Sequence, residues 1–419
     1  MLDETNLKKK TMGKSWFYLE SHIYVSFKSG KILLYDTHTG QSIVEESPKA
    51  ISIVQAIYED VNLGSLELCQ EEINDPIINE FIEKILSNRM GKLQKINSTS
   101  VKPVILLPIL SLNLDVERFK DKENLDLFLA RDISKYLLDV NIVLNSFCQQ
   151  KCQHCENYYK QFFCCSKGNM SEALSYDYLH SLLCQISCYP VRTVNITGGN
   201  IYKYHNLEMF NISNKEGKKV FNFYIHYLNY EENRYIDNQN IHIIINVPIN
   251  MEKLREVYSL TKAKEVKYHL IVENEGQYSE LEQAMMELEI DDFEIHPYYN
   301  GQNIQFFEEN VYMSIEDIVA TPISMREIFR NQKLNANSFG SLYILPNGDI
   351  KANLNEETIG HLGKERIIDV INNEMMQNTA WRKVRSSEPC NNCVFQYLCP
   401  PLSNYERAIK RQNLCHVLK

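Results

Sequence analysis

The sequence predicts an α/β protein built around a parallel sheet, with a smaller unit before the sheet and a cysteine-bearing unit after it. Between residues 140 and 299, six segments have the β-branched and aromatic composition of strands, and helical stretches lie between most of them. Residues 16–46 hold short strand-like runs, and the alternation of strands and helices ends before residue 339. A chain of 419 residues has room for about two or three domains.

The first predicted unit covers residues 16–98. Turn signals at 28–30 and 38–40 divide residues 16–46 into short strands, which indicates a three-stranded meander. Helical spacing of apolar residues follows in 48–61 and 75–90, and Asp75-Pro76 is a typical helix start. The irregular apolar stretch from Lys102 to Leu114 is interpreted as a connecting segment packed on the next domain.

The central unit alternates strands with helices. Helices are expected within 175–186, 250–261 and 278–288. Such crossovers predict a parallel sheet, and ligands of parallel sheets bind at the carboxyl ends of the strands. The six predicted strands are 140–146, 191–197, 221–228, 241–248, 266–273 and 293–299.

The last unit begins with a predicted hairpin in residues 340–354 that turns at Pro346-Asn347-Gly348-Asp349. A cysteine-bearing tail follows it.

Composition excludes several classes of protein. Hydrophobic residues at 44% and charged residues at 23% match a soluble globular chain. The net charge of −10 argues against nucleic acid as a partner. The longest apolar stretch, from Val104 to Leu114, is too short for a membrane span. The N-terminal MLDETNLKKK carries charges where a signal peptide has its apolar core, so the expected location is the cytoplasm.

The twelve cysteines are the most informative residues of the sequence. Disulfides do not persist in a reducing compartment, so closely grouped cysteines there indicate metal or cluster ligands. The first group leaves one coordination position open, with His154 between its thiolates, and a [4Fe–4S] cluster can offer such a position to an exchangeable ligand. Four thiolates in the second group also complete a tetrahedral zinc site, so zinc stays open there. The groups are C-x3-C-x2-C, formed by Cys148, Cys152 and Cys155, and C-x2-C-x5-C, formed by Cys390, Cys393 and Cys399, with Cys415 further on.

The first cysteine group directly follows the first predicted strand, and Thr197-Gly198-Gly199-Asn200 follows the second. Both therefore belong at the same rim of the sheet.

Other cysteines and histidines are interpreted as structural. Cys184 and Cys188 lie four residues apart on a predicted amphipathic helix, which favours burial as small hydrophobic side chains. Cys164-Cys165, in the loop after the first group, is expected to be inert. Three histidines near strand ends, His205, His226 and His296, are expected to be hydrogen-bonded parts of the fold.

A C-x3-C-x2-C motif after the first strand and a Gly-Gly turn after the second resemble radical S-adenosylmethionine (SAM) enzymes, over about residues 135–300. The resemblance implies a partial (βα)6 barrel. It also implies a [4Fe–4S] cluster on Cys148, Cys152 and Cys155, with SAM at its open iron. An electron donor such as flavodoxin or ferredoxin would reduce this cluster, and the reduced cluster would cleave SAM to a 5′-deoxyadenosyl radical. No further catalytic residue is singled out.

The resemblance also implies roles in SAM binding. Gly198 and Gly199 would let the backbone approach the amino end of SAM. Asn200 stands where the family commonly has Glu, and an amide brings no negative charge to the SAM ammonium. Asn246 after the fourth strand is expected near the ribose, and Tyr298 after the sixth near the adenine.

The C-terminal cysteines resemble the outer-cluster ligands of a SPASM domain, the auxiliary-cluster module of radical SAM enzymes that act on peptides. This implies a second [4Fe–4S] cluster on Cys390, Cys393, Cys399 and Cys415. The segment 350–360 has no cysteine, and Ser403 stands where the family has one, so the inner cluster of the family is expected to be lost.

Residues 15–98 resemble a RiPP recognition element, which binds the leader of a ribosomally made precursor peptide by strand addition. The expected organisation is a leader-binding domain over 1–98, a linker over 99–139, a radical SAM barrel over 140–330 and a SPASM-like domain over 331–419. The whole resembles peptide-modifying proteins encoded beside precursors with Gly-Gly leaders in Bacteroidales. The expected function is a maturase that installs a crosslink, thioether or epimerised centre, and the alternative is a non-catalytic relative that presents the precursor to a partner.

Overall fold

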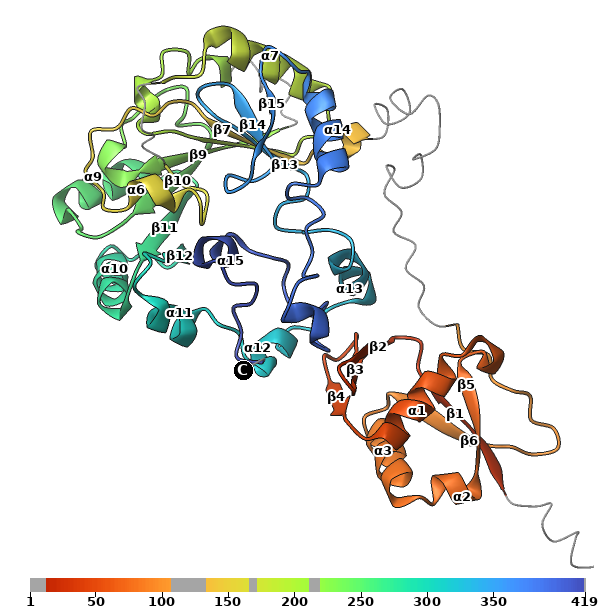
Figure 1. The fold of residues 1–419 in the computed structure, drawn as a ribbon. Coiled ribbons are helices and arrows are strands. Elements are labelled where there is room, and N and C mark those ends of the chain that lie inside the picture. Colours follow the sequence, from red (N-terminus) through yellow and green to blue (C-terminus); the bar gives the residue numbers. More distant parts are fainter. Residues whose placement is uncertain (1–12, 107–132, 166–171, 211–218, 418–419) are drawn as a thin grey trace, which may run out of the picture.

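The computed structural model describes residues 13–106, 133–165, 172–210 and 219–417 (Figure 1), and a nine-stranded sheet is its largest element. The α/β class is confirmed, and all six predicted central strands are present. They lie side by side in chain order and are parallel: β7 (Asp139–Val143), β8 (Thr193–Thr197), β9 (Val220–His226), β10 (Asn240–Ile245), β11 (Val266–Val272) and β12 (Phe293–Pro297).

The sheet continues beyond β7 into the C-terminal part of the chain. The strand β13 (Ser341–Ile344) pairs in parallel with β7, with Ser341 opposite Asp139. The predicted hairpin is present as β13 and β14 (Asp349–Lys351), and β15 (Thr358–His361) completes the sheet.

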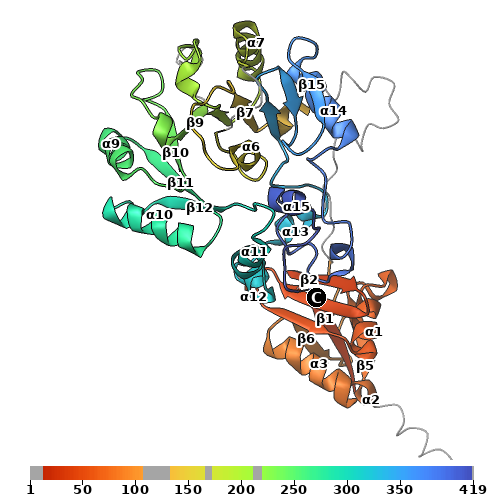
Figure 2. The same ribbon diagram turned by 60° about the vertical axis from the view of Figure 1, so that its left-hand side comes forward.

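The two faces of the parallel strands differ in chemistry because side chains alternate along a strand. One face is apolar, with residues such as Ile142, Ile196 and Ile243 in the main core. It is covered by the predicted helices α7 (Tyr176–Ser187), α9 (Met251–Thr261) and α10 (Glu275–Glu287), which Figure 2 shows around the outside of the strands. We call the opposite face the inner face; α6 (Cys155–Tyr158) packs on it through Tyr158.

The inner face carries a row of hydrogen-bonded asparagines near the start of the strands. Asn195 Nδ2 donates to Asn141 Oδ1 at 2.8 Å, Asn222 Nδ2 to Asn195 Oδ1 at 2.8 Å, and Asn240 Nδ2 to Asn222 Oδ1 at 3.0 Å. Each amide supplies both a donor and an acceptor, so the row satisfies polar groups across four strands and fixes their register.

The N-terminal unit contains two antiparallel sheets. The predicted meander is present as β2 (Ile23–Lys28), β3 (Lys31–Asp36) and β4 (Ser42–Glu45). A second sheet, which was not predicted, places β1 (Lys14–Leu19) between β5 (Ser65–Cys69) and β6 (Gly91–Lys95). β6 reads GKLQK and is mostly exposed, so it lacks the alternating apolar pattern that would have identified it.

Both predicted N-terminal helices are present, as α1 (Pro48–Ile57) and α3 (Pro76–Ser87), with the short α2 (Gln70–Ile73) between them. Asp75 caps α3: its Oδ1 accepts from the backbone N–H of Ile77 at 3.1 Å and of Ile78 at 3.3 Å.

The C-terminal segment packs against the N-terminal unit. Its helices are α11 (Ile304–Asn310), α12 (Ile315–Val319), α13 (Met325–Asn331), α14 (Ile367–Gln377) and α15 (Asn404–Ile409). Tyr35 and Leu33 of β3 share a hydrophobic cluster with Ile328 and Phe395. The Tyr35 hydroxyl accepts a hydrogen bond from Ile323 N at 2.8 Å, so the contact between the units is specific as well as apolar.

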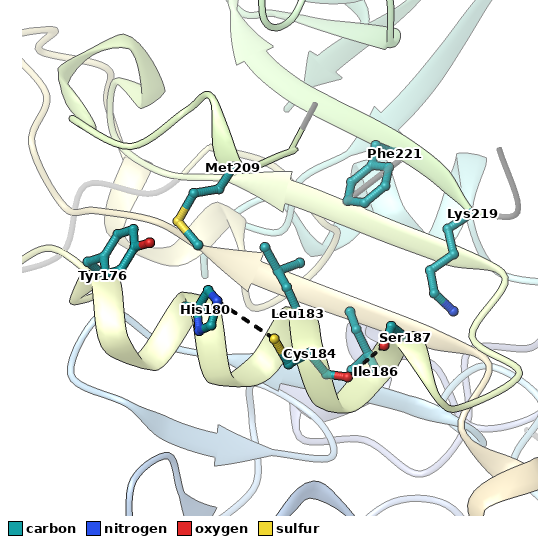
Figure 3. Close-up of a pocket in the computed structure, with 9 residues that line it drawn as sticks. All are labelled: Tyr176, His180, Leu183, Cys184, Ile186, Ser187, Met209, Lys219 and Phe221. Carbon is teal, nitrogen blue, oxygen red and sulfur yellow. Dashed lines mark hydrogen bonds between the residues drawn. The ribbon is translucent and has the colours of Figure 1, made fainter. Parts of the chain in front are cut away.

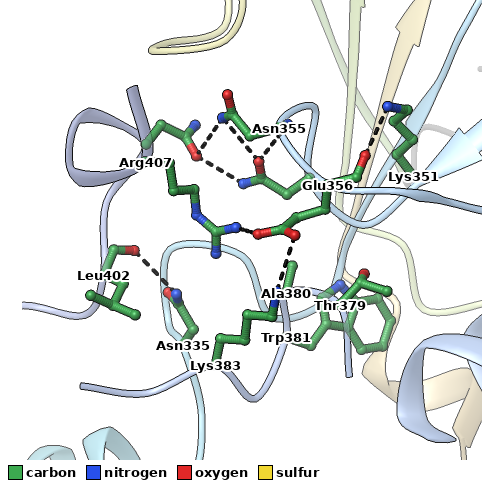
Figure 4. A network of polar contacts seen from close by, with 12 residues as sticks. Asn335, Lys351, Asn355, Glu356, Thr379, Ala380, Trp381, Lys383, Leu402 and Arg407 are labelled. Atoms are coloured by element: carbon green, nitrogen blue, oxygen red, sulfur yellow. Dashed lines mark hydrogen bonds and ion pairs between the residues drawn. The ribbon is translucent and has the colours of Figure 1, made fainter. Parts of the chain in front are cut away.

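A polar network holds α15 to the end of the sheet (Figure 4). Glu356, in the connection between β14 and β15, pairs with Arg407 of α15 and, at 3.0 Å, with Lys383. These contacts join three stretches of the C-terminal segment that are distant in sequence.

The predicted division of the chain into four domains stays a prediction. Most of the predicted linker 99–139 lies outside the described residues, as does the end of the apolar stretch that begins at Val104. Among the described residues, no helix is both long and apolar enough to cross a bilayer.

Candidate functional site

The loop that carries the first cysteine group leaves the carboxyl end of β7 and runs beside the Gly-Gly turn after β8. Leu144 N donates to Thr197 O at 2.8 Å, and Gly199 N donates to Asn145 O at 2.9 Å. Asn200 N also donates to Phe147 O. The structure therefore brings the cysteine loop and the Gly-Gly turn together at one rim of the sheet.

Gly199 is glycine because of its contact with the cysteine loop. A Cβ atom at Gly199 would lie 2.3 Å from Phe147 O, and one at Gly198 would lie 3.1 Å from Asn145 O. The space for a side chain is already taken by backbone, so these glycines let the two loops pack closely. The sequence-based explanation had assigned that space to SAM alone.

We expect Gly199→Ala to displace the cysteine loop, because the added methyl group meets a carbonyl that cannot move independently. Such overpacking costs about 1–3 kcal/mol. The measurement is urea unfolding together with the iron bound at the first cysteine group. The matched control is Gly276→Ala, whose Cβ would meet only the Asn274 side chain, at 3.2 Å. Iron binding by Gly199→Ala equal to that of this control would contradict the expectation.

Two buried side chains at the end of β9 lie beside the first cysteine group. Asn229 Nδ2 donates to Cys148 Sγ at 3.5 Å, and His226 Nε2 lies 3.5 Å from Cys152 Sγ. His226 Nδ1 accepts from Leu228 N at 3.3 Å, so Nε2 is the nitrogen that carries the proton, and its nearer acceptor is Asn246 Oδ1 at 2.8 Å. Cys148 Sγ therefore faces an N–H donor, which stabilises a thiolate and is a typical neighbour of metal-bound cysteine.

Asn246, at the end of β10, belongs to the same network. It is buried, and its Oδ1 accepts from His226 Nε2 at 2.8 Å. It also forms side-chain hydrogen bonds to Cys152 and Tyr158. Asn246 thus lies at the rim where the sequence placed it, but its hydrogen bonds go to the cysteine site and its neighbours.

Asn200 has a local role. Its Oδ1 accepts from Tyr202 N at 3.0 Å and caps the short 3-10 helix Ile201–Lys203, while its backbone O accepts from Asn145 Nδ2 at 3.0 Å. One acceptor site of the amide is therefore used by its own loop.

Tyr298, after β12, lies beside the cysteine loop. Its ring packs edge-on against Tyr158 at 4.6 Å between centroids and lies 5.5 Å from the His154 ring. His154 Nε2 is 3.9 Å from a carboxylate oxygen of Glu273, which follows β11. Residues from the carboxyl ends of all six parallel strands therefore surround the first cysteine group.

Cys165 is a neighbour of the first group that the sequence analysis missed. It is buried, and its charge interacts with those of Cys148 and Cys152. Burial and these like charges raise the pKa of Cys152 to about 11. A hydrogen bond with Cys164 and burial raise the pKa of Cys165 well above its usual range, so this thiol stays protonated, in keeping with the expectation that it is inert. Its contact with the first group was not predicted, because the loop had to fold back to bring it there.

The second cysteine group is assembled from two separate stretches of the chain. All four sulfur-bearing residues line one small cavity of about 20 Å³, which is the space of roughly one water molecule. The lining also includes the apolar Met313, Leu414 and Val417 and the polar Arg385, Gln396 and Asn413. The four are Cys390, Cys393, Cys399 and Cys415, as the sequence predicted.

Arg385 connects the second group to the rest of the fold. It is buried, forms an ion pair with the buried Glu406 of α15, and directs Nη1 at Cys390 Sγ, 3.8 Å away. Asn413 Nδ2 donates to Cys415 Sγ at 3.6 Å. Burial raises the pKa of Cys399 to about 12, and the Arg385 charge opposes this effect. Ser403 caps α15 by accepting from Glu406 N at 3.4 Å.

The donor chemistry of both groups fits a thiolate-bound metal or cluster. Four thiolates on one zinc ion lie about 3.8 Å apart, from a Zn–S bond of about 2.3 Å. Within the described chain, no three of these sulfurs lie within 4.8 Å of one another.

Beneath the cysteine loop, the inner face holds buried histidines. Burial lowers the pKa of His226 to about 4 and of His242 to about 4, with Lys267 contributing to the second shift. Both rings are neutral near pH 7.

We expect the free energy of unfolding to fall between pH 7 and pH 5. The unfolded histidines bind protons below about pH 6.5, whereas the folded ones resist protonation until about pH 4. The stabilisation by each neutral histidine is fully present above pH 6.5 and is lost progressively as the pH falls from 6.5 through 4. At pH 5 the loss in the free energy of unfolding is on the order of 2 kcal/mol for each histidine. Urea unfolding at both pH values measures it. A His226→Gln/His242→Gln variant should depend less on pH, and an identical dependence would refute the assignment.

A separate pocket of about 330 Å³ lies on α7, away from both cysteine groups (Figure 3). Its lining includes His180 and Cys184, whose Sγ lies 3.8 Å from His180 Nε2. Cys184 and Cys188 are both exposed, so the prediction that they are buried was wrong. The apolar stripe of α7 is formed instead by Leu179, Leu182, Leu183 and Ile186.

The chain resembles known proteins in its structure and not in its sequence. No family model matches the sequence, and no curated protein matches it. Among solved structures, the chain is similar to SuiB of Streptococcus suis in a crystal structure with bound S-adenosylmethionine. The TM-score is 0.42 and the sequence identity is 12%, over 95% of this chain and 98% of that chain. A similarity at this level leaves the family open, so the function proposed below rests on the residues of the two cysteine groups.

Proposed function

We propose that the chain is a radical SAM enzyme that modifies a ribosomally made, leader-bearing precursor peptide. The observation that carries the proposal is the position of Cys148, Cys152 and Cys155 at the carboxyl ends of the parallel strands, beside the Gly198-Gly199 turn. In this proposal the strands β7 to β12 form the partial (βα)6 barrel, and the C-terminal segment is the SPASM-like part.

A [4Fe–4S] cluster with SAM at its open iron would supply the radical chemistry when bound. The residues of this chain would hold and position it. The three thiolates would ligate iron, Asn229 would donate a hydrogen bond to Cys148, and Asn246 would donate one to Cys152. A second [4Fe–4S] cluster would be held by the C-terminal group, with Arg385 near Cys390 and Asn413 near Cys415. An electron donor such as flavodoxin or ferredoxin would reduce the protein.

The N-terminal unit would bind the leader by strand addition to β4. This strand is an edge of its sheet within the described residues. Asp36 N donates to Gln41 O at 2.9 Å, and hydrogen bonding alternates along an antiparallel pair. Ser42 and Val44 therefore direct their backbone groups away from β3, toward an incoming strand.

A cavity beside β4 leads to the second cysteine group. It has a volume of about 520 Å³ and is lined by Val44 and Lys31 on one side and by Pro389, Cys393 and Phe395 on the other. A peptide added to β4 would thus lie next to the C-terminal segment.

We expect Val44→Pro to weaken leader binding by the full chain, because proline removes the outward N–H without removing a bond between β3 and β4. The loss should be at least about tenfold, from one donor of about 1–1.5 kcal/mol plus the bulk of the ring at the edge. Fluorescence anisotropy with a labelled precursor peptide from the same gene neighbourhood measures it. Val44→Ala keeps the N–H and is the control. Undiminished binding by Val44→Pro, or by a protein lacking residues 1–98, would reject the assignment.

The second candidate is a non-catalytic protein of the same fold that presents the precursor to a partner. Two observations favour it. Asn200 brings no carboxylate and uses an acceptor in its own loop. In addition, Tyr158, Phe162 and Cys165 pack directly on Ile244 and Ile271 of the inner face. A presenter would bind the peptide but would not cleave SAM.

Anaerobic reconstitution tests the cofactor content common to both candidates. Two [4Fe–4S] clusters should give about eight iron and eight sulfide per chain. About one zinc per chain without iron would overturn both cluster assignments.

A further inference from the structure

A second group of potential ligands lies on the inner face, apart from the cysteines. His242, His269 and His296 come from the neighbouring strands β10, β11 and β12 and are joined in a row. His242 Nδ1 is 2.8 Å from His269 Nε2, and His269 Nδ1 is 2.9 Å from His296 Nε2. Glu294 places a carboxylate oxygen 3.4 Å from His269 Nδ1 and 3.8 Å from His296 Nε2.

Three ligand atoms therefore converge: His269 Nδ1, His296 Nε2 and Glu294 Oε2, all within 4.8 Å of one another. A neutral imidazole has one N–H. His269 Nδ1 and His296 Nε2 face each other and share one hydrogen bond, so a single proton lies between the two nitrogens. The Glu294 carboxylate adds only lone pairs and no proton. A cation placed among the three atoms would satisfy all of them.

The spacing matches a transition-metal site. Ligands about 2.0–2.1 Å from a metal, at angles between about 90° and 110°, lie about 2.9–3.4 Å apart. The observed separations of 2.9, 3.4 and 3.8 Å fall in or near this range, and the longest involves Glu294, whose side chain is half exposed and free to adjust.

The surroundings of the three atoms resemble those of a metal site as well. A metal-bound histidine usually gives its other ring N–H to a partner that fixes its orientation. His269 Nε2 has such a partner in the buried His242, whose ring stacks on Tyr224 at 4.3 Å. The ring of Phe162, from the cysteine loop, stacks on His296 at 5.0 Å.

We propose that His269, His296 and Glu294 form a binding site for a divalent transition-metal ion such as Zn²⁺ or Fe²⁺. Two imidazoles and one carboxylate suit these ions. Three protein ligands leave at least one coordination position for water or for a group of a bound molecule. The site stands independently of what the cysteine groups hold.

Co²⁺ is the probe, because its spectrum distinguishes the ligands. Co²⁺ bound to nitrogen and oxygen has visible ligand-field bands, whereas thiolate-bound Co²⁺ adds intense near-ultraviolet charge-transfer bands. The full chain is titrated with Co²⁺ after reconstitution of its cysteine groups, and the same titration is made with Glu294→Gln, which changes an exposed side chain and should fold normally. We expect the wild-type chain to bind one more Co²⁺ than this variant, with a difference spectrum free of thiolate bands.

Two further variants test the geometry. His296→Gln should lose the same Co²⁺, and His242→Gln should keep the ligands but bind about 10- to 100-fold more weakly, as expected for loss of an orienting partner. His180→Gln, on the exposed side of α7, is the control and should bind as the wild type does. Equal Co²⁺ stoichiometry and spectra for the wild type and Glu294→Gln would overturn the proposal, whatever the iron content of the cysteine groups.

Discussion

Cys152→Ala is expected to remove about half of the reconstituted iron and to abolish cleavage of SAM to 5′-deoxyadenosine. Cys152 is the cysteine of the first group with the most polar partners, since His226 and Asn246 both contact its sulfur. In the proposed cluster an alanine there would remove one of three iron ligands, and that cluster would account for four of about eight iron atoms.

The measurement combines iron and sulfide content with detection of 5′-deoxyadenosine after anaerobic reduction. Cys184→Ala removes an exposed cysteine outside both groups and should keep full iron and full cleavage. Cys393→Ala should lose the other half of the iron while retaining some cleavage. If the wild-type chain carries its full iron complement and yet forms no 5′-deoxyadenosine with or without precursor, the enzyme proposal fails and the presenter takes its place.

Arg385→Ala is expected to destabilise the C-terminal segment strongly and to empty the second cysteine group. The substitution leaves Glu406 buried without a counter-charge, which typically costs about 3–5 kcal/mol. It also removes the donors to Cys390 Sγ and to Pro400 O, which lie on either side of the C-x2-C-x5-C stretch.

Urea unfolding and iron content measure this effect. Arg366→Ala breaks an exposed ion pair with Asp369 and is the control, since such pairs contribute about 0–1 kcal/mol. A fall in iron confined to the C-terminal group, with SAM cleavage retained in part, is the expected pattern. Unchanged stability of Arg385→Ala would mean that the Glu406 carboxylate finds another partner.

The central sheet could be predicted because its signals are local. The six parallel strands gave continuous apolar or alternating runs, and the intervening helices had caps such as Asn250 and Asn274 with regular apolar spacing. The rim was predictable too, because parallel topology alone places the residues after β7 and β8 next to each other. Ser29-Gly30 and Asp75-Pro76 likewise fixed a turn and a helix start through backbone preferences of single residues.

What the sequence did not reveal depends on contacts between distant segments. Cys165, Arg385 and the Glu294 carboxylate acquire their roles only when loops and strands meet, and nothing in their own neighbourhoods distinguishes them. Cys184 and Cys188 were predicted to be buried but are exposed. A spacing of four residues places two side chains on one side of a helix, and it fits the polar stripe of α7 as well as the apolar one.

The parallel pairing of β13 with β7 has a consequence for how the chain can be divided. A protein shortened after residue 330 would keep all six strands of the proposed barrel, yet it would expose the full backbone edge of β7. The cysteine loop follows this strand directly, so the strand most prone to pair with another molecule would be the one that positions Cys148, Cys152 and Cys155. Chimeras that exchange C-terminal segments between related proteins should therefore be joined after β15, with residues 341–361 kept together with the parallel strands.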